Sequence, residues 1–396
     1  MKVVFISNFL NHHQLPFCDN MYVALGEGYK FIQTEPVNAE RLNMGYEDME
    51  GKYPYIICPY KDNRQLEITE KVLDEADFVI VGSAPIEYLE RRLKENKPVL
   101  RFLERFLRHQ KWRFLTPKSL RFMYNNHTKY RKKKVYLLCA SAYAARDFAL
   151  YGAYKNKTFK WGYFPEVLEH DIDSLIKRKR KDVVEILWVA RFLKLKHPEK
   201  FLKALNRLKE EGIDFNAKII GSGECEQEMR LYVEKNGLEK SVSFLGTMPP
   251  SEVRKHMESS NIFVFNSDYR EGWGAVINES MNSGCGVISS HAPGAVPFLI
   301  EHGKNGLVYN NRNFSELYSN LKKLVLDREL CETMGKNAYQ TMKNIWNAKN
   351  AVEKLIELLK ILKSGKKINI ESGPCSVARP IPQRRMYKAC IEGEKI

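Results

Sequence analysis

The chain has 396 residues, of which 44% are hydrophobic and 28% charged, a composition typical of a globular protein long enough for two domains. Its 64 basic and 48 acidic residues give a formal net charge of +16. Such an excess favours binding to an anionic partner. No 18-residue apolar stretch predicts a membrane span, and the short apolar run at the start indicates a strand, not a signal peptide. Eight scattered cysteines without a Cys-x-x-Cys pair predict reduced thiols and a cytoplasmic location.

In the first half of the chain, apolar runs that predict strands alternate with segments that predict helices, as in parallel α/β proteins. The predicted strands are 3–6, 29–33, 55–58, 78–81, 99–102 and 135–139, and the predicted helices are 14–25, 66–75 and 86–95. These elements predict a Rossmann-like first domain over 1–165. The charged run at 177–182 predicts a linker over 166–182.

The alternation restarts after this run and predicts a second Rossmann-like domain over 183–345. Its predicted strands are 186–190, 217–220, 242–244, 262–265 and 287–289, and its predicted helices are 199–209, 226–236, 251–258 and 275–283. A further predicted helix covers 346–364. Residues 365–396 are rich in Lys, Gly, Pro and Ser, which predicts a loosely packed basic tail.

Two acidic residues flank a Gly-Trp-Gly turn in the most informative segment of the second domain. Glu271 precedes the turn, which contains Trp273 and Gly274, and Glu279 lies inside the predicted helix that follows. The rise of 1.5 Å per helical residue places the two carboxylates roughly 7–12 Å apart along the axis, a gap that a diphosphate fits. The segment therefore predicts a sugar–diphosphate–nucleoside ligand. The alternative is a solvated turn followed by a first-turn acid that complements the helix dipole.

Two cations follow the predicted strand 186–190. Arg191 and Lys196 leave this strand at its carboxyl end, where open α/β sheets collect ligands, and a guanidinium with an ammonium can neutralise a diphosphate. The alternative is ordinary surface charge in a Lys-rich protein.

The order of these motifs carries a resemblance to a known family. Arg191 with Lys196, the Gly221-Ser222-Gly223 turn, Phe244-Leu245-Gly246 and Glu271 with Glu279 follow one another as in family 4 glycosyltransferases, over about residues 183–309. A looser resemblance in element order covers 1–165. The resemblance implies the GT-B fold, in which two Rossmann-like domains place parallel sheets across a cleft, with 346–364 as a helix crossing back to the first domain. It also implies retention of anomeric configuration and independence of metals and cofactors.

Roles follow from the resemblance at the matching positions. Arg191 and Lys196 would bind the diphosphate, Glu271 the donor sugar near its anomeric carbon, and Glu279 the ribose. The other expected donor-binding residues are Trp273, Gly274, Gly221, Gly223, Gly246 and Thr247. An Asp-x-Asp pattern at Asp171 and Asp173, used by other glycosyltransferases to hold a metal, lies in the charged interdomain stretch and is interpreted as a chance match.

The acceptor side of the chain departs from the family. The loop after the first strand lacks glycines and carries His12 and His13, of which His13 could serve as base or hydrogen-bond donor to the acceptor. Where many members have a histidine after a later strand, this chain runs from 98–103 into Glu104, the second acceptor-side candidate. The alternative is that these side chains are structural or solvated.

Much of the positive charge falls in residues 105–134, where basic residues are interleaved with aromatic ones. This mixture suits an anionic membrane surface and predicts a peripheral position on the inner face of the cytoplasmic membrane. Nucleic acid is a less favoured partner because no nucleic-acid-binding motif accompanies the charge. The remaining alternative is a solvated cationic helix pair whose aromatic side chains pack inward.

The sequence thus predicts transfer of a sugar from a UDP- or GDP-sugar to a hydroxyl group of a glycan or lipid-linked acceptor, in the synthesis of a cell-surface polysaccharide or glycolipid. A sugar-nucleotide epimerase of the same shape and a non-catalytic sugar-nucleotide-binding scaffold remain as alternatives. A dinucleotide-dependent oxidoreductase is disfavoured because no Gly-x-Gly-x-x-Gly follows the first strand.

Overall fold

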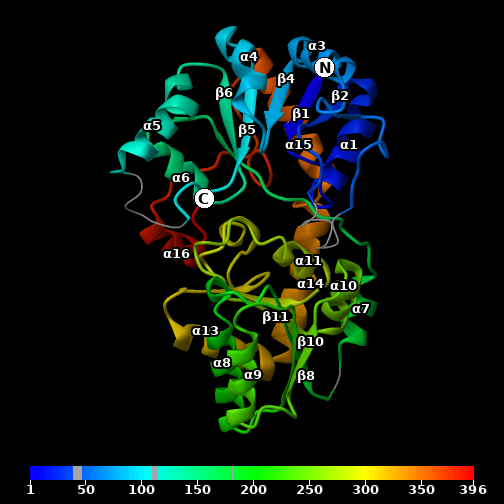
Figure 1. The fold of residues 1–396 in the computed structure, drawn as a ribbon. Coiled ribbons are helices and arrows are strands. Elements are labelled where there is room, and N and C mark those ends of the chain that lie inside the picture. Colours follow the sequence, from blue (N-terminus) through cyan, green and yellow to red (C-terminus); the bar gives the residue numbers. More distant parts are fainter. Residues whose placement is uncertain (39–46, 109–114, 181) are drawn as a thin grey trace. The chain divides into compact units, whose positions relative to one another are not determined.

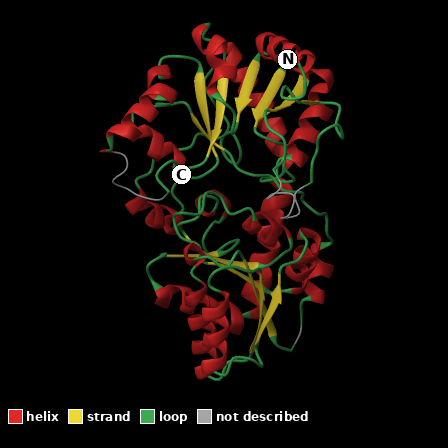
Figure 2. Ribbon diagram, in the orientation of Figure 1, coloured by secondary structure: helices red, strands yellow, loops and turns green. Residues whose placement is uncertain are grey.

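A computed structural model describes residues 1–38, 47–108, 115–180 and 182–396, and the chain divides into two compact units (Figure 1). The first unit comprises Met1–Glu166 and Trp346–Ile381, and the second comprises Val167–Ile345 and Pro382–Ile396. Each unit is built on one parallel sheet with helices packed beside it (Figure 2). Of the residues singled out in the sequence, Lys111, Trp112, Arg113, Phe114 and Lys181 lie outside the described ranges.

The first unit contains a seven-stranded sheet in the order β3-β2-β1-β4-β5-β6-β7. Its strands are β1 Val3–Ser7, β2 Tyr29–Gln33, β3 Ile56–Ile57, β4 Phe78–Val81, β5 Val99–Leu103, β6 Val135–Cys139 and β7 Thr158–Lys160. Its helices are α1 Leu15–Leu25, α3 Asn63–Glu75, α4 Glu90–Lys94, α5 Pro117–Asn126, α6 Ala144–Ala149 and α15 Ala348–Ser364. Every residue of β1 and β4 is buried, which explains why these strands read as continuous apolar runs. Helix α15 packs against α1.

The second unit contains a six-stranded sheet in the order β10-β9-β8-β11-β12-β13. Its strands are β8 Val184–Val189, β9 Phe215–Ile220, β10 Val242–Gly246, β11 Ile262–Phe265, β12 Gly286–Ser290 and β13 Leu307–Tyr309. Its helices are α7 Ile172–Arg178, α8 Pro198–Glu210, α9 Glu226–Lys235, α10 Pro250–Ser259, α11 Val276–Asn282, α12 Val296–Leu299, α13 Phe314–Leu326, α14 Arg328–Asn344 and α16 Gln383–Glu392. Helix α8 contacts α9 and α13, whereas α14 contacts α7 and α11.

Both sheets reverse their strand order at one point. In the first unit the chain moves outward on one side from β1 and on the other from β4, and in the second it does so from β8 and β11. Ligands of doubly wound sheets bind outside the carboxyl ends of the strands at such a switch point. The topology thus singles out the loops after β1 and β4 in one unit and those after β8 and β11 in the other. The predicted pair of Rossmann-like domains is confirmed.

The segment 166–182 differs from the linker that its charge predicts. It contains α7, whose Leu175 and Ile176 are buried, and the residue directly after this helix, Lys179, is buried too. The Lys179 ammonium donates to the main-chain oxygens of Met257 at 3.1 Å, Ser260 at 2.8 Å and Ser283 at 2.6 Å. These carbonyls lie at the ends of α10 and α11, where helices leave acceptors without partners.

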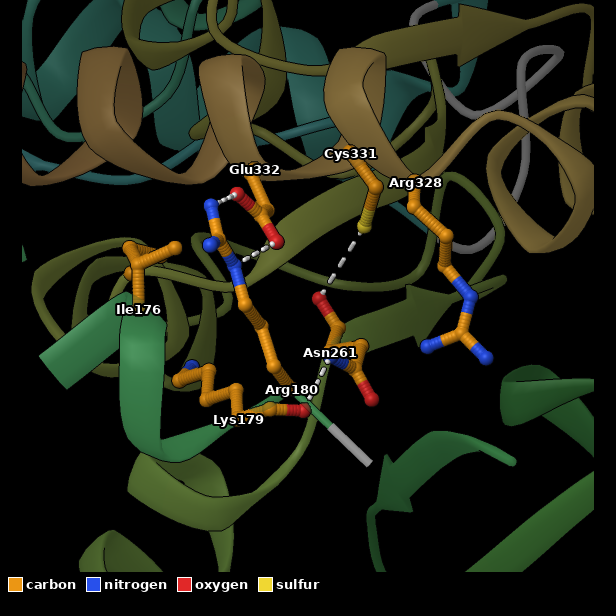
Figure 3. Close-up of a pocket in the computed structure, with 8 residues that line it drawn as sticks. Ile176, Lys179, Arg180, Asn261, Arg328, Cys331 and Glu332 are labelled. Carbon is orange, nitrogen blue, oxygen red and sulfur yellow. Dashed lines mark hydrogen bonds and ion pairs between the residues drawn. The ribbon is translucent and has the colours of Figure 1, made fainter. Parts of the chain in front are cut away.

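A pocket adjoins Lys179 near the amino-terminal ends of the strands of this sheet (Figure 3). The Arg180 guanidinium and the Glu332 carboxylate form a two-point ion pair across it, with donor–acceptor distances of 2.8 and 2.6 Å. Lys179 donates to main-chain oxygens, and Arg180 and Glu332 pair with each other. We therefore interpret this pocket as part of the packing between α7 and α14 and not as a ligand site.

The residues from 365 onward are more tightly packed than their composition predicts. Main-chain bonds join them to the edge strand β7: Cys375 N donates to Lys160 O at 2.8 Å, and Lys160 N to Ser376 O at 2.8 Å. Further on, α16 places Tyr387 over the His291 ring, with centroids 5.3 Å apart. A segment that pairs through its main chain needs little apolar periodicity. Its packing against β7 therefore could not be predicted from its composition.

Eight cysteines, all within the described ranges, are buried free thiols. Among the helices that the structure describes, none is long and apolar enough to cross a membrane.

Candidate functional site

The loops that follow β8 and β11 are joined by a lysine–glutamate pair. The Lys196 ammonium and the Glu271 carboxylate form an ion pair, and their side chains are 13% and 18% exposed. The ammonium also lies 5.2 Å from the centroid of the Phe265 ring at the end of β11. Two residues 75 positions apart are thus brought together at the switch point of the second sheet.

A second charged cluster supports this pair. His197 adopts a left-handed φ of +50° before Pro198 and directs Nε2 toward the Asp268 carboxylate at 3.3 Å and Nδ1 toward Glu199 at 2.9 Å. Hydrogen bonds from His197 to the Asp268 and Glu199 carboxylates raise the pKa of His197 above its ordinary value. Burial works against ionisation of Asp268, but hydrogen bonds from His197 and Arg270 hold the pKa of Asp268 well below its usual range. These hydrogen bonds therefore stabilise the charged forms of His197 and Asp268.

Main-chain and amide contacts fix the two loops to each other. Asp268 N donates to Leu195 O at 2.9 Å. Asn266, directly after β11, accepts from Trp188 Nε1 at 2.7 Å and donates through Nδ2 to His197 O at 2.6 Å. Sequence reasoning missed Asn266, His197 and Asp268, although His197 and Asp268 sit inside the two motifs it singled out.

Arg191 lies in the same loop as Lys196, but the environments of the two side chains differ. Its side chain is exposed and forms no ion pair with any residue that the structure describes. This loop thus presents one free guanidinium beside one ammonium that a carboxylate already holds.

The glycine-rich loop after β9 lies directly against the loop after β8. A Cβ on Gly221 would stand 1.9 Å from Ala190 O, and one on Gly223 would stand 2.8 Å from Phe192 O. Phe192 N donates to Ser222 O at 2.7 Å, which shows how close the two main chains run. Both glycines have positive φ, +134° and +151°. Only glycine allows this approach.

The end of β10 joins the same edge of the sheet. Gly221 N donates to Gly246 O at 2.8 Å. Gly246 has a φ of +70° with open space where a Cβ would lie, and the next residue, Thr247, is exposed. Gly221, Gly223 and Gly246 therefore lie at the carboxyl ends of the strands of this sheet, against the loop after β8 that also carries Lys196.

The turn between Glu271 and α11 is rigidly packed. Gly274 has a φ of +97°, and a Cβ there would meet the Phe265 ring at 2.8 Å. Trp273 is buried and donates through Nε1 to Asn278 Oδ1 at 3.0 Å. This contact places Trp273 in the interior, so its indole supports the turn. Glu279 lies in the first turn of α11, where burial raises the pKa of its carboxyl and the charge of Arg254 partly opposes that rise.

A pocket of about 490 Å³ opens beside these loops, lined by His197, Glu199, Cys225 and Arg270 among others. It lies between the loops after β8, β9 and β11, within the second unit. The charged cluster around Asp268 therefore forms part of a hollow surface.

In the first unit, the acceptor-side candidates surround Tyr163. The Glu104 carboxylate accepts from the Tyr163 hydroxyl at 3.1 Å and pairs with Arg108 at 2.9 Å. The His13 ring lies 6.3 Å from the Tyr163 ring and 3.9 Å from that of His12, between centroids. Burial, with a smaller effect from His12, lowers the pKa of His13 to about 3, so its imidazole is neutral.

The Asp-x-Asp residues have structural partners in the second unit. Asp171 caps α7 and accepts from the Ser174 hydroxyl at 2.7 Å, and Asp173 pairs with Lys336 at 2.5 Å.

The two sheets and their connections define the GT-B class of fold. Anabaena HepE in complex with UDP has a TM-score of 0.67 at 16% sequence identity, covering 91% of this chain and 100% of that one. A glycosyltransferase from Rickettsia africae gives a TM-score of 0.63 at 16% identity, covering 92% and 99%. The chain therefore has the GT-B fold, as its motifs predicted.

Residues 171–341 match a family model described as glycosyl transferases group 1. This stretch contains all six strands of the second sheet and the Lys196–Glu271 pair. The chain is 30% identical over 181 residues to a D-inositol 3-phosphate glycosyltransferase of Corynebacterium jeikeium, covering 43% of each. It is 28% identical over 185 residues to the putative colanic acid biosynthesis glycosyltransferase WcaL of Escherichia coli, covering 45% of each. The match spans less than half the length of these curated relatives.

Proposed function

We propose that the protein is a glycosyltransferase that moves a sugar from a UDP- or GDP-sugar to a hydroxyl acceptor. The observation that carries this proposal is the Lys196–Glu271 pair at the switch point of the second sheet, inside the stretch that matches the family model. A cation held by an acid at this position can bind phosphate while the acid faces the sugar. The solved HepE complex with UDP, on the same fold, supports this choice of donor.

In the proposed reaction, the bond between the anomeric carbon and the diphosphate oxygen breaks as the acceptor oxygen attacks that carbon. Negative charge grows on the leaving diphosphate, where Arg191 and Lys196 would stabilise it. Glu271 would orient the donor sugar and favour the positive charge that develops on its anomeric carbon. Glu279, whose raised pKa reflects its burial, would hold the ribose hydroxyls.

The family resemblance supports retention of the anomeric configuration. Attack would then come from the same face that the diphosphate leaves, with a diphosphate oxygen taking the proton of the acceptor hydroxyl. On the acceptor side, the neutral imidazole of His13 can hydrogen-bond to the acceptor hydroxyl, and we assign His13 and Glu104 to acceptor positioning. No metal ion or cofactor takes part in this proposal.

A nucleotide-sugar screen tests the donor site. We expect UDP- or GDP-sugars to raise the melting temperature of the purified protein, because a ligand at one hundred times its Kd stabilises the folded state by about 2.7 kcal/mol. The shift should vanish in Lys196→Ala. ADP- and CMP-sugars serve as control ligands.

Product analysis on the same samples separates the alternatives. Transfer to an added glycan acceptor supports the transferase, whereas conversion of the donor without any acceptor would identify an epimerase. A stabilising response with neither product would point to a binding scaffold. The relatives named for polysaccharide synthesis make bacterial exopolysaccharide fragments the acceptors to try.

We also propose that a basic surface in the first unit contacts an anionic membrane. We define this basic surface as Lys118, Arg121, Lys129 and Arg131, all exposed, on and after α5. Large apolar side chains are exposed beside them, namely Leu115, Leu120, Phe122 and Tyr124. The exposure of Phe122 and Tyr124 argues against a helix pair whose aromatic residues all pack inward. Apolar and cationic groups on one surface suit a lipid interface.

Vesicle binding tests this surface. Changing its four cations to glutamine should weaken binding to phosphatidylglycerol vesicles at least tenfold, since each cation contributes on the order of 1 kcal/mol. The measurement is co-sedimentation, with phosphatidylcholine vesicles as the neutral control. A matched variant removes four exposed lysines of the second unit: Lys203, Lys235, Lys240 and Lys323. If both variants lost the same vesicle affinity, the binding would depend on net charge alone and not on this surface.

A further inference from the structure

A buried arginine in the first sheet has no carboxylate partner among the residues that the structure describes. Arg101 lies in the middle of β5, between Val81 of β4 and Leu137 of β6, and its side chain is 93% buried, since 7% remains exposed. Its Nε and Nη2 atoms are buried without a hydrogen-bond acceptor, and it forms no ion pair within the described residues. Its guanidinium lies 6.0 Å from the centroid of the Tyr130 ring.

Two other buried arginines of the same unit show how such a charge is normally accommodated. The terminal nitrogens of Arg92 donate to four main-chain oxygens, including Leu73 O at 2.6 Å and Ala76 O at 2.9 Å. Arg105 pairs with the buried Asp147 carboxylate at 3.3 Å. Buried charges are otherwise strongly unfavourable. Arg101 therefore differs from arginines that only support the fold.

Arg101 lines a pocket of about 420 Å³ at the carboxyl ends of β4 and β5. Ser83 and Glu87 come from the segment after β4, and Asn126 and His127 come from the end of α5. Glu87 is the lone carboxylate of this lining, and it is exposed to solvent and forms no ion pair in the described part of the chain. The position is the ligand-binding edge of a doubly wound sheet, beside the switch from β1 to β4.

His127 is the other residue lining this pocket that could carry a positive charge, and its imidazole is neutral. Burial, and to a lesser degree the Arg101 charge, lowers the pKa of His127 to about 3. Its Nδ1 lies 2.7 Å from the Tyr154 hydroxyl. Among the described residues that line this pocket, Arg101 is thus the one buried cation, and its planar N–H groups suit a carboxylate or a phosphate.

We propose that this pocket binds an oxyanion, a phosphate or a carboxylate, through the Arg101 guanidinium. The oxyanion would belong to the acceptor, as a phosphate ester or as the carboxylate of an acidic sugar. That assignment to the acceptor rests on the proposed glycosyltransferase function. The binding of the oxyanion itself depends only on the pocket of the first unit.

Calorimetric titration with three probes tests the proposal: inorganic phosphate, D-glucuronate and neutral D-glucose. We expect phosphate or glucuronate to bind the full-length protein, and we expect Arg101→Met to weaken that binding at least tenfold. Binding of phosphate alone indicates a phosphorylated acceptor, and binding of glucuronate alone indicates an acidic sugar. Binding of neither anion, equal binding of glucose, or unchanged binding in Arg101→Met would overturn the proposal.

Two further variants separate this site from the donor site and from the fold. Lys196→Ala should lose the response to UDP but keep the response to the anion, whereas Arg101→Met should do the opposite. A failure of the donor proposal would therefore leave this test intact. Arg101→Met should keep or raise the melting temperature, because it removes an unpaired buried charge, whereas Arg92→Met should lower it. A fall in Arg101→Met as large as in Arg92→Met would make Arg101 a structural residue.

Discussion

Replacing Lys196 by alanine should reduce the rate of sugar transfer at least a hundredfold. Loss of one group that stabilises developing negative charge lowers kcat by about 10²–10³ in other enzymes, and Lys196 is the cation held at the switch point of the second sheet. Glu271→Ala should have an effect of similar size, because it removes the group proposed to orient the donor sugar and takes away the carboxylate partner of the Lys196 ammonium. The measurement is the initial rate of product formation from the donor that the screen identifies.

The control for this prediction is Lys203→Ala, which removes an exposed lysine from α8 in the same unit. It should retain the wild-type rate. Melting temperatures of all three variants show whether the second unit remains folded. Wild-type rates in both Lys196→Ala and Glu271→Ala would contradict the proposed roles of this pair.

Replacing Gly221 by alanine should destabilise the second unit by roughly 3 kcal/mol or more, the range of substitutions that force a main-chain shift. The new Cβ would stand 1.9 Å from Ala190 O at a φ of +134°, so the loops after β8 and β9 would have to separate. Because that separation also moves the loop that carries Arg191 and Lys196, nucleotide binding should fall with stability. Urea denaturation followed by fluorescence measures the free energy of unfolding.

Gly246→Ala is the matched control, because it has a positive φ of +70° but open space around the new Cβ. We expect a loss of about 1–2 kcal/mol from backbone strain alone. If Gly221→Ala cost no more than Gly246→Ala, the close approach to Ala190 would not be what requires glycine at this position.

The strands and helices that could be predicted are those whose burial produces an apolar pattern in the sequence. Fully buried strands such as β1 and β4 appear in the sequence as unbroken apolar runs, and their alternation with helices indicates the parallel sheets. The motif order around Lys196 and Glu271 is also local, so the sequence could single out both residues. Their contact across 75 residues, however, depends on the adjacency of β8 and β11.

The parts that could not be predicted depend on contacts distant in sequence. Lys179 reads as one cation in a charged run, yet three carbonyls from two other helices allow its burial. The segment around Cys375 is held by main-chain pairing with β7, which leaves no side-chain pattern. Arg101 lies in an apolar run that predicts an ordinary strand, and only the pocket and the lack of a carboxylate partner in the described part of the chain distinguish it. The roles assigned to His13, Glu104 and the donor-binding glycines stay predictions.

A crystal structure of the protein with UDP tests the assignment of the donor site, because it shows where the diphosphate lies. We expect phosphate oxygens within about 3 Å of the Arg191 guanidinium and the Lys196 ammonium, a hydrogen-bonding distance. We also expect Glu279 to contact the ribose. A nucleotide bound elsewhere, with no contact to Lys196 or Glu271, would contradict this donor site.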